Sequence, residues 1–221
     1  MIAAVNENAC RRARDAAAQN GSVKLPRGFY NRPTLDVARD LIGKVLVNTC
    51  RGVRTSGVIV EVEAYVGESD PACHAAPGPT KRNAPLYGPP GFAYVYLNYG
   101  IHWLVNAVTE AEGSPAAVLI RALEPLEGVA AMQRRRGRRV SHHALCRGPG
   151  NLTVAMGITQ AQNREDLCGP RLYIEDRGLP APKEISWGPR IGIRVGTERP
   201  WRGYVAAHPS VTARTGPGRV R

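Results

Sequence analysis

The 221-residue chain lacks any long apolar segment. No run of 18 apolar residues occurs, so the sequence predicts no membrane-spanning helix. Its N-terminus also lacks the apolar core of a secretory signal, being polar and rich in alanine. We expect residues 1–24 to form a flexible arm, residues 25–215 a single domain, and residues 216–221 a short tail.

Paired cysteines and phosphate-binding loops are absent as well. Five cysteines are scattered without a CxxC pair, which is typical of free thiols in a reducing cytoplasm. His142, His143 and Cys146 lie close together, but the second ligand pair usual in a zinc site is missing. GxGxxG and GxxxxGK[ST] patterns do not occur. We therefore expect no metal and no nucleotide cofactor.

Lysine is scarce, yet the chain is strongly basic. Only four of its 30 basic residues are lysines, and 18 acidic residues leave a net charge of +12. Such an arginine excess predicts a polyanionic partner, with nucleic acid as the leading class. The alternative is that the charge serves only solubility.

Strand and helix patterns are segregated along the chain, which favours a single α+β domain. Residues 68–91 form a Pro/Gly-rich loop, a length typical of functional or disordered segments. After Pro125 we expect a strand to become a helix that runs into a basic stretch. Strands are expected over 44–50, 56–67, 92–97, 101–109, 171–178, 188–196 and 202–212, and helices over 35–42 and 148–158.

One expected strand carries two carboxylates. In VIVEVEAYVG the period of two places Glu61, Glu63 and Tyr65 on one face, and Val60 with the other small apolar residues on the opposite face. Glutamate is depleted in strands, so a pair on one face suggests a general base beside an aromatic wall. The alternative is a solvated outer face with an arginine partner.

Three tyrosines crowd the segment YVYLNYG. Tyr94 and Tyr96 share one face of a strand, and Tyr99 lies at the expected hairpin tip. A ring at such a tip could act as a wedge in duplex DNA, because enzymes that modify a base must swing it out of the stack. Alternatively, the rings cover an edge of the core.

The ordered motifs EVEAYVG, ACHAAPG, TKRN, GFAYVYLNYGIHWLVNAV, AVLIRALEPLEG and RGPGNL resemble the alkyladenine (3-methyladenine) DNA glycosylase family over residues 28 to 212. The resemblance implies a curved, mostly antiparallel sheet with surrounding helices and a β-hairpin that enters the DNA minor groove. It also implies a monofunctional enzyme of base-excision repair. Such an enzyme hydrolyses the N-glycosidic bond of damaged purines in duplex DNA and leaves an abasic site.

Residue roles follow from the same resemblance. Glu63 matches the base that activates water, and Arg121 and the segment near Ile191 match groups that hold this water. Tyr65 and Tyr96 resemble the two walls of the base pocket. The implied substrates are 3-methyladenine, 7-methylguanine, hypoxanthine and ethenoadenine.

Further matches concern selectivity and DNA contact. His74 resembles the pocket histidine whose main-chain N–H meets the 6-position of the base, and Asn106 the asparagine that crowds the 2-amino group of guanine. Tyr99 matches the minor-groove wedge, and Tyr94 a tyrosine that braces the site. We assign Tyr94, like Lys81 and Arg82, to the DNA-binding set. For the last two, plain surface charge is the alternative.

Several alternatives stay open at this stage. His102 and Trp103 differ from other members and could alter lesion preference. Arg134–Arg139 could contact flanking phosphates or form a solvated loop. A hydrolase of free nucleosides could use the same Glu63, and a non-catalytic nucleic-acid-binding module needs only the rings and arginines. Lys81 is the residue to test for strand cleavage. We expect a monomer in a bacterial cytoplasm, because no nuclear import tail is evident.

Overall fold

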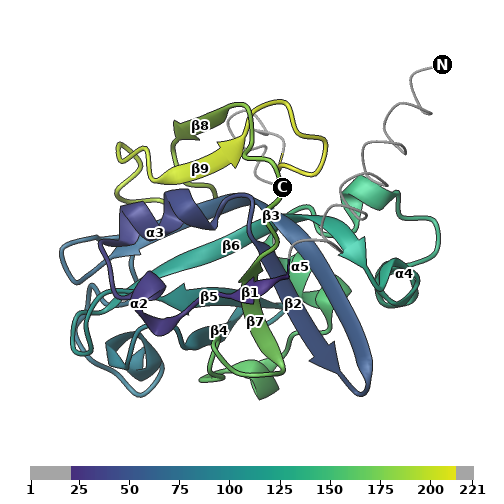
Figure 1. Ribbon diagram of the computed structural model, residues 1–221. Helices are drawn as coiled ribbons and strands as arrows, with labels where there is room; N and C mark the ends of the chain where they lie inside the picture. Colours follow the sequence, from purple (N-terminus) through teal and green to yellow (C-terminus); the bar gives the residue numbers. More distant parts are fainter. Residues whose placement is uncertain (1–20, 213–221) are drawn as a thin grey trace.

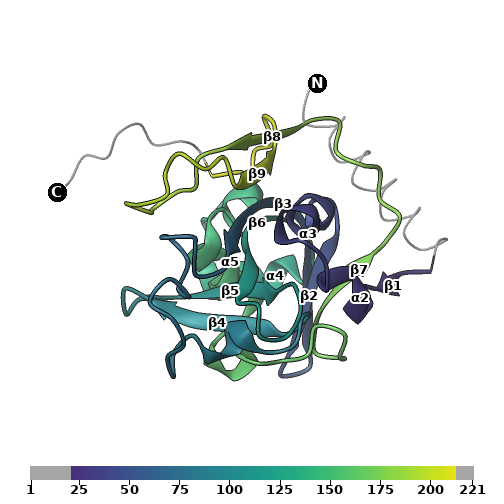
Figure 2. The same cartoon turned by 90° about the vertical axis from the view of Figure 1, so that its left-hand side faces the viewer.

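One curled antiparallel sheet organises residues 21–212, the part of the chain that the structure, a computed structural model, describes (Figure 1, Figure 2). Most of the expected arm, residues 1–20, lies outside this part. Residues 213–221, which include the expected tail, lie outside it as well. The sheet order is β1-β7-β2-β3-β6-β5-β4, and the β8–β9 hairpin joins it where β9 pairs with β3. The strands are β1 (Val23–Lys24), β2 (Val45–Cys50), β3 (Val53–Val66), β4 (Ala93–Asn98), β5 (His102–Val108), β6 (Ala116–Glu127), β7 (Leu172–Asp176), β8 (Ile185–Gly188) and β9 (Arg202–Val205).

Short helices pack against the sheet. The helix expected over 35–42 is confirmed as α3, which buries Val37, Ala38 and Leu41 and ends just before Gly43 at φ +91°. A helix within 148–158 is confirmed as well. Every helix within residues 21–212 is too short and too polar to span a bilayer. The helices are α2 (Arg27–Tyr30), α3 (Thr34–Leu41), α4 (Val129–Arg136) and α5 (Pro149–Met156), with 3-10 turns η1 (Ala84–Tyr87), η2 (His142–Ala144) and η3 (Gln160–Gln162).

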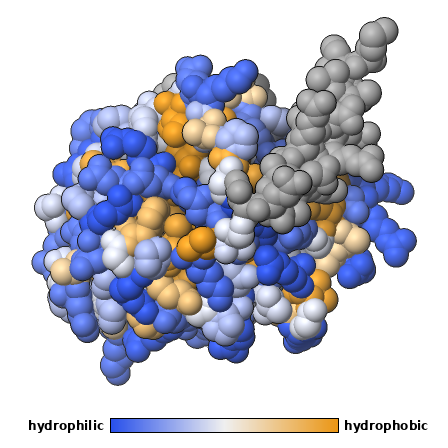
Figure 3. Space-filling view, viewed as in Figure 1, coloured by the Kyte–Doolittle hydropathy of each residue, from blue (hydrophilic) through white to orange (hydrophobic). Residues whose placement is uncertain are grey.

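Both faces of the sheet are covered. The main core joins side chains of the sheet to α3, α4 and α5, and it includes Val62 and Ala64. A smaller cluster on Tyr94 and Ala117 packs beneath the 68–91 loop through Leu86, with Tyr65 and Tyr96 at its edge. Hydrophilic residues dominate the molecular surface seen in Figure 3, with apolar patches between them. The single α+β domain expected from the sequence is thereby confirmed.

A bulge in β3 modifies the expected alternation. Ile59 pairs with Leu123 and Glu61 with Ala122, so Val60 has no partner of its own on β6. An extra residue of this kind resets which side chains face the core. Ile59, and not Val60, therefore joins Val62 in the main core, and this part of the expected pattern was wrong.

The helix expected after Pro125 is present as α4, but it begins later than expected. Strand β6 continues to Glu127, and Pro125 pairs with Gly57 beside a register shift, a position where a missing N–H is tolerated. Helix α4 begins only after Gly128, which has φ +71°. A Cβ at Gly128 would lie 2.4 Å from the carbonyl oxygen of Arg54, so the close approach of the two strands requires glycine here.

The basic run is partly structural. Helix α4 stops at Arg136, and Arg135 donates to the carbonyl of Ala155 at 2.8 Å, near the end of α5. The Arg136 guanidinium donates to the carbonyl of Leu145 at 3.1 Å. Arg134, Arg138 and Arg139 are exposed. A fully solvated loop is therefore excluded for Arg135 and Arg136.

The C-terminal third contains fewer strand residues than expected. The segment RIGI, expected in a strand over 188–196, lies in a loop that follows β8. Gly192 and Gly196 in this loop have φ of +80° and +63°. The N–H of Ile191 donates to the side chain of Glu63 and not to a neighbouring strand. The loop is therefore shaped by its contacts with β3.

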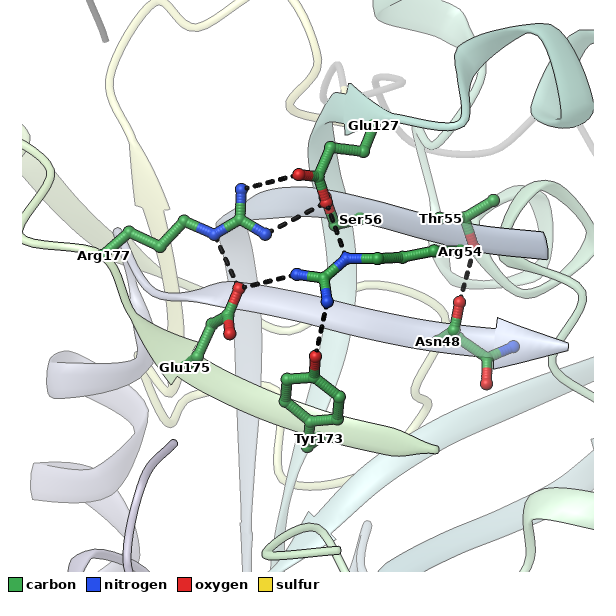
Figure 4. A network of polar contacts seen from close by, with 8 residues as sticks. All are labelled: Asn48, Arg54, Thr55, Ser56, Glu127, Tyr173, Glu175 and Arg177. Atoms are coloured by element: carbon green, nitrogen blue, oxygen red, sulfur yellow. Dashed lines mark hydrogen bonds and ion pairs between the residues drawn. The ribbon is translucent and has the colours of Figure 1, made fainter. Parts of the chain in front are cut away.

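A partly buried ionic network ties three strands together (Figure 4). Arg54 of β3 and Arg177, which follows β7, both contact Glu127 at 3.1 Å. Glu175 of β7 lies 2.6 Å from Arg177 and 3.3 Å from Arg54. Tyr173 accepts a further bond from Arg54 at 2.8 Å. Each carboxylate thus has two arginine partners, which satisfies charges that burial would otherwise penalise.

Candidate active site

An aromatic pocket of about 370 Å³ opens on the face of the sheet beneath the 68–91 loop. Strands β3, β4, β5 and β6 supply its floor and walls, and the loop after β8 closes one side. The pocket brings together residues that are far apart in sequence, from Tyr65 to Ile193. Its lining includes Tyr65, His74, Tyr94, Tyr96, Asn106, Arg121 and Ile191, with Tyr99 and Asn98 near the hairpin.

Glu63 lies directly behind this lining and is fully buried. Oε1 of its carboxylate accepts the N–H of Ile191 at 2.7 Å, and Oε2 accepts the hydroxyl of Tyr65 at 2.8 Å. Nη1 of Arg121 is 3.2 Å from the same Oε2. All three partners line the pocket. The alternative of a solvated outer face for Glu63 is therefore excluded.

Burial and charge act in opposite directions on Glu63. Burial raises the pKa of its carboxyl above the usual value, and Glu61 adds to this effect. Arg121, the N–H of Ile191 and the hydroxyl of Tyr65 lower the pKa, but they do not outweigh burial. A carboxylate with raised proton affinity, adjoining a pocket, is suited to act as a general base.

The aromatic walls come from two strands. Tyr65 belongs to β3, and Tyr96 to β4, where it stacks on Tyr94 with 5.2 Å between ring centroids and an interplanar angle of 28°. The His74 ring meets Tyr96 edge-on at 4.4 Å. Flat surfaces of this kind favour a planar, unsaturated ligand.

His74 is held as a neutral ring. Burial lowers the pKa of its imidazole, and the nearby charge of Arg82 lowers it further. Nδ1 of His74 lies 2.9 Å from the Tyr94 hydroxyl, and the carbonyl of His74 accepts from Asn83 at 2.8 Å. A neutral imidazole near pH 7 favours a hydrogen-bonding role over proton donation.

Tyr94 and Asn106 face each other in the β4–β5 ladder. The amide of Asn106 donates to the carbonyl of Tyr94 at 2.9 Å, and the side chain is buried in the pocket wall. Tyr94 is only 2% exposed. Its ring is therefore almost entirely enclosed, with the hydroxyl 2.9 Å from Nδ1 of His74.

The β4–β5 hairpin projects an exposed tip. Tyr99 and Gly100 both have positive φ, +48° and +71°, and the N–H of Ile101 donates to the carbonyl of Asn98 at 3.0 Å. A tyrosine in the left-handed region is unusual and holds its ring away from the strands. Tyr99 is 83% exposed and Ile101 72%. Ile101 is a second apolar tip residue that the sequence reasoning missed, although its place in the turn was a usable signal.

The TKRN turn lies beside the hairpin. Arg82 donates to the carbonyl of Leu97 at 3.1 Å, and its guanidinium lies 5.7 Å from the Tyr96 ring centroid. Lys81 is exposed. Arg82 therefore supports the hairpin, and Lys81 precedes it on the exposed surface of the same turn.

An ion pair behind the pocket was also missed. Arg190 contacts both oxygens of Asp70, at 2.5 and 2.8 Å, and neither side chain is exposed. Its guanidinium lies 4.7 Å from the centroid of the Tyr65 ring and donates to the carbonyl of Ala64 at 3.0 Å. The arginine thus anchors the loop that carries Ile191. The flanking glycines of Arg190 were a signal against the strand expected here.

Other candidate sites are less suited to chemistry. Within residues 21–212 no group of three or more histidine, cysteine or acidic side chains is arranged to hold a metal. A larger hollow of about 890 Å³ lies between β3, β6 and the segment after β7. Its glutamates at 127 and 175 are already paired with arginines, and its other walls are mainly aliphatic and proline side chains. Its third glutamate, Glu124, lies 3.3 Å from Nε2 of His208, and none of the described tyrosine, tryptophan or phenylalanine rings lines it.

Known proteins are similar in sequence to this chain along nearly the whole domain. A relative from Methanocella arvoryzae is 51% identical over 200 residues, covering 89% of this chain and 98% of its own. One from Bradyrhizobium diazoefficiens is 53% identical over 178 residues, covering 80% and 85%. A third, from Burkholderia cenocepacia, is 48% identical over 194 residues, covering 87% and 92%. Each bears the name "Putative 3-methyladenine DNA glycosylase".

A family model described as methylpurine-DNA glycosylase matches residues 28–209. This range contains the pocket, Glu63, the hairpin and the loop of Ile191. It agrees with the resemblance that the ordered motifs indicated over residues 28 to 212. The chain belongs to the methylpurine-DNA glycosylase family, whose members are DNA glycosylases of base-excision repair.

Proposed function

We propose that this protein removes alkylated and deaminated purines from duplex DNA and leaves an abasic site. The observation that carries the proposal is the position of Glu63, buried behind a pocket walled by Tyr65 and Tyr96. A purine swung out of the duplex would lie between the two rings. Its glycosidic bond would then face the carboxylate and the water that this carboxylate activates.

The contacts of Glu63 leave room for that water. A carboxylate offers about four acceptor sites. Among the described residues, Ile191 uses one on Oε1, and Tyr65 and Arg121 use those on Oε2. One acceptor site on Oε1 is left, next to the loop of Ile191. Water bound there would give its proton to Glu63 as it attacks the anomeric carbon, and Glu63 would also stabilise the oxocarbenium-like transition state.

Selectivity would arise from polar groups in the pocket wall. The main-chain N–H of His74 would donate to a 6-carbonyl, as in hypoxanthine, and oppose the 6-amino group of adenine. Asn106 would crowd the 2-amino group of guanine. A donor facing a donor in a buried site rejects a substrate by orders of magnitude. The proposed substrates are 3-methyladenine, 7-methylguanine, hypoxanthine and ethenoadenine.

Surface residues would hold the duplex. Tyr99 would enter the minor groove at the tip of the hairpin and fill the space left by the flipped base. Lys81 and Arg82 would contact phosphates, in keeping with a net charge of +12. We further propose that the protein acts as a monomer, without cofactor, in a bacterial cytoplasm.

A duplex with a single hypoxanthine tests the proposal. The labelled duplex is incubated with the protein, and one half of the sample is then heated in alkali. Strand scission only after alkali is the expected result, because water leaves an intact abasic site. Scission without alkali would indicate a lyase, with Lys81 as the first candidate. Failure to release any modified base, alkylated bases included, would favour a binding module, and hydrolysis of free inosine alone a nucleoside hydrolase.

A further inference from the structure

The second carboxylate of β3 has no place in the mechanism above. Glu61 is as deeply buried as Glu63, and neither side chain has exposed surface. Isolated buried charges are costly, so a fully buried glutamate is retained only with close partners. The contacts of Glu61 therefore bear on what it does for the site.

Three donors surround Glu61. Its Oε1 accepts from Nε of Arg202 at 2.6 Å and from Nε of Arg121 at 3.2 Å. Its Oε2 accepts the N–H of Thr212 at 2.9 Å. Nη1 of the same Arg121 is the atom that reaches Glu63. Charges of opposite sign therefore alternate from Arg202 through Glu61 and Arg121 to Glu63.

The backbone explains how one arginine reaches both carboxylates. Glu61 pairs with Ala122 and Val62 with Ile120, so Arg121 is an extra residue on β6 without a partner on β3. A bulged residue of this kind is re-aimed relative to the regular ladder. Arg121 thereby presents its Nε edge to Glu61 and only Nη1 to Glu63.

The way in which Arg121 shares its N–H groups between the two carboxylates affects Glu63. A buried arginine with a single carboxylate partner favours a bidentate pair with two parallel hydrogen bonds. Such a pair would occupy further acceptor sites of Glu63. Arg121 would then also stabilise the ionised form of Glu63 more strongly. Glu61 takes the Nε–H that the second bond would need.

We propose that Glu61 is a positioning residue that divides Arg121 between two carboxylates and so keeps an acceptor site of Glu63 open to the attacking water. The inference rests on the proposed function. It concerns how the base is kept competent and adds a residue to the machinery. Glu61 itself touches neither the pocket nor the base that would be flipped, since it does not line the pocket.

The charges around Glu63 set the expected pH behaviour. Arg121 from β6 and Arg190 from the loop after β8 act on it, and Arg202 of β9 lies opposite it in register. Tyr65 of β3 and Tyr96 of β4 are neutral neighbours, and the charge of Glu63 raises the pKa of both hydroxyls. Among these groups, Glu61 supplies the negative charge. Glu61→Gln should therefore lower the pKa of Glu63.

Three proteins are compared on the hypoxanthine duplex. Wild type, Glu61→Gln and Glu175→Gln are measured for kcat, KM and the pH dependence of kcat/KM, and each is checked by thermal unfolding. Glu175 is a matched control because it is also buried and paired with two arginines, Arg54 and Arg177, outside the pocket (Figure 4). Both variants should lose stability, because each removes one charge from a buried network.

Only Glu61→Gln should change the chemistry. We expect kcat to fall about tenfold with little change in KM, as for an interaction that acts in the transition state. Its acidic limb of kcat/KM should move to lower pH, while Glu175→Gln keeps the wild-type limb. An unchanged kcat and limb in a folded Glu61→Gln protein would overturn the inference.

A second variant covers the case in which Glu61→Gln does not fold. Glu61→Asp keeps the charge, but its shorter side chain reaches Nε of Arg121 less well, so kcat should fall and the acidic limb should move to lower pH by less than in Glu61→Gln. A kcat and a limb both equal to wild type would contradict the inference. If wild type itself releases no base, the proposed function fails and this inference with it. An active wild type with unaffected Glu61 variants overturns the inference alone.

Discussion

The N–H of Ile191 lies 2.7 Å from Oε1 of Glu63, although 128 positions of sequence separate the two residues. The loop after β8 is therefore part of the immediate environment of Glu63. Arg190 anchors this loop through Asp70, and Tyr65 lies against the same guanidinium. Activity should thus depend on residues that touch neither DNA nor water.

Replacing Glu63 by Gln should abolish base release and preserve lesion binding. The amide oxygen can still accept the N–H of Ile191, so the pocket keeps its shape, but it cannot take a proton from water. General-base catalysis contributes about 10²–10⁴-fold, and the single-turnover rate should fall by that order. Fluorescence anisotropy with the hypoxanthine duplex should give an affinity near that of wild type.

Glu198→Gln is the control, because its carboxylate is 72% exposed and outside the pocket. It should release hypoxanthine at the wild-type rate. A fully active Glu63→Gln protein would show that another group activates the water. A variant that neither binds nor cleaves would point to a structural role for Glu63, which thermal unfolding can identify.

Tyr99→Gly should separate stability from activity. Left-handed backbone costs a non-glycine residue about 1–2 kcal/mol, and glycine avoids this cost at φ +48°. Glycine's own entropy offsets roughly 0.5–1 kcal/mol of the gain. The melting temperature should therefore be unchanged or higher. Excision from a duplex should fall more than excision from single-stranded DNA, because only the duplex needs the wedge, and equal losses on both substrates would contradict this role.

Arg190→Met should destabilise the protein strongly. It leaves the buried carboxylate of Asp70 without its bidentate partner, a loss of about 3–5 kcal/mol for a pair with no exposed surface. Burial would raise the pKa of Asp70, but Arg190 holds it below the usual value, so the charge persists in wild type. Chemical denaturation should show the loss.

The double variant Arg190→Met/Asp70→Asn tests the origin of that loss. Removing the orphaned charge should recover part of the stability. Base release should stay below wild type, because the loop of Ile191 is still without its anchor. If the double variant were no more stable than Arg190→Met alone, the penalty would not come from the unpaired carboxylate.

Local pattern was enough for most of the sheet. Alternation placed Glu61, Glu63 and Tyr65 on one face, and the contact between Tyr65 and Glu63 agrees with this. It failed at Val60, because a bulge is decided by the register of the neighbouring strand. The start of the helix after Pro125 was misplaced for a related reason. Strand β6 accommodates the proline at a register shift, where the ladder needs no N–H.

Long-range partners explain the other omissions. The pairs Arg190–Asp70 and Arg202–Glu61 span 120 and 141 positions, and single-sequence patterns carry no information on such pairings. The family resemblance supplied Arg121 and Ile191, but not the anchors behind them. The residues proposed to touch the substrate could therefore be predicted from the sequence, whereas the residues that anchor them needed the fold.

Glu127→Gln should reduce stability in a pH-dependent way. Burial tends to raise the pKa of Glu127, but hydrogen bonds from Arg177, Ser56 and Arg54 outweigh it and lower the pKa to about 2. A depressed carboxyl pKa stabilises the fold above the unfolded value of about 4.5, and this contribution is lost as pH falls toward 2.

The difference in unfolding free energy between wild type and Glu127→Gln should accordingly be largest near neutral pH and shrink through the acidic range. Urea denaturation at several pH values measures it. Glu112→Gln, at an exposed position, is the control and should show no such trend. A difference that stays constant down to acidic pH would mean that the charge of Glu127 is not what stabilises the network.

Tyr65→Phe should shift the pH profile of activity in the opposite direction to Glu61→Gln. The Tyr65 hydroxyl donates to Oε2 of Glu63 and lowers the pKa of this carboxyl. Without it the pKa of Glu63 rises further, so the base stays protonated to higher pH. The ring is kept, so stacking on the flipped purine and KM should change little.

The measurement is the acidic limb of kcat/KM on the hypoxanthine duplex, which reports the base in the free enzyme. Tyr94→Phe is a matched control, because its hydroxyl bonds to His74 and not to Glu63. Its limb should stay at the wild-type position. If Tyr65→Phe leaves the limb in place or moves it to lower pH, the titrating group is not Glu63, because the loss of a donor to a carboxylate can only raise its proton affinity.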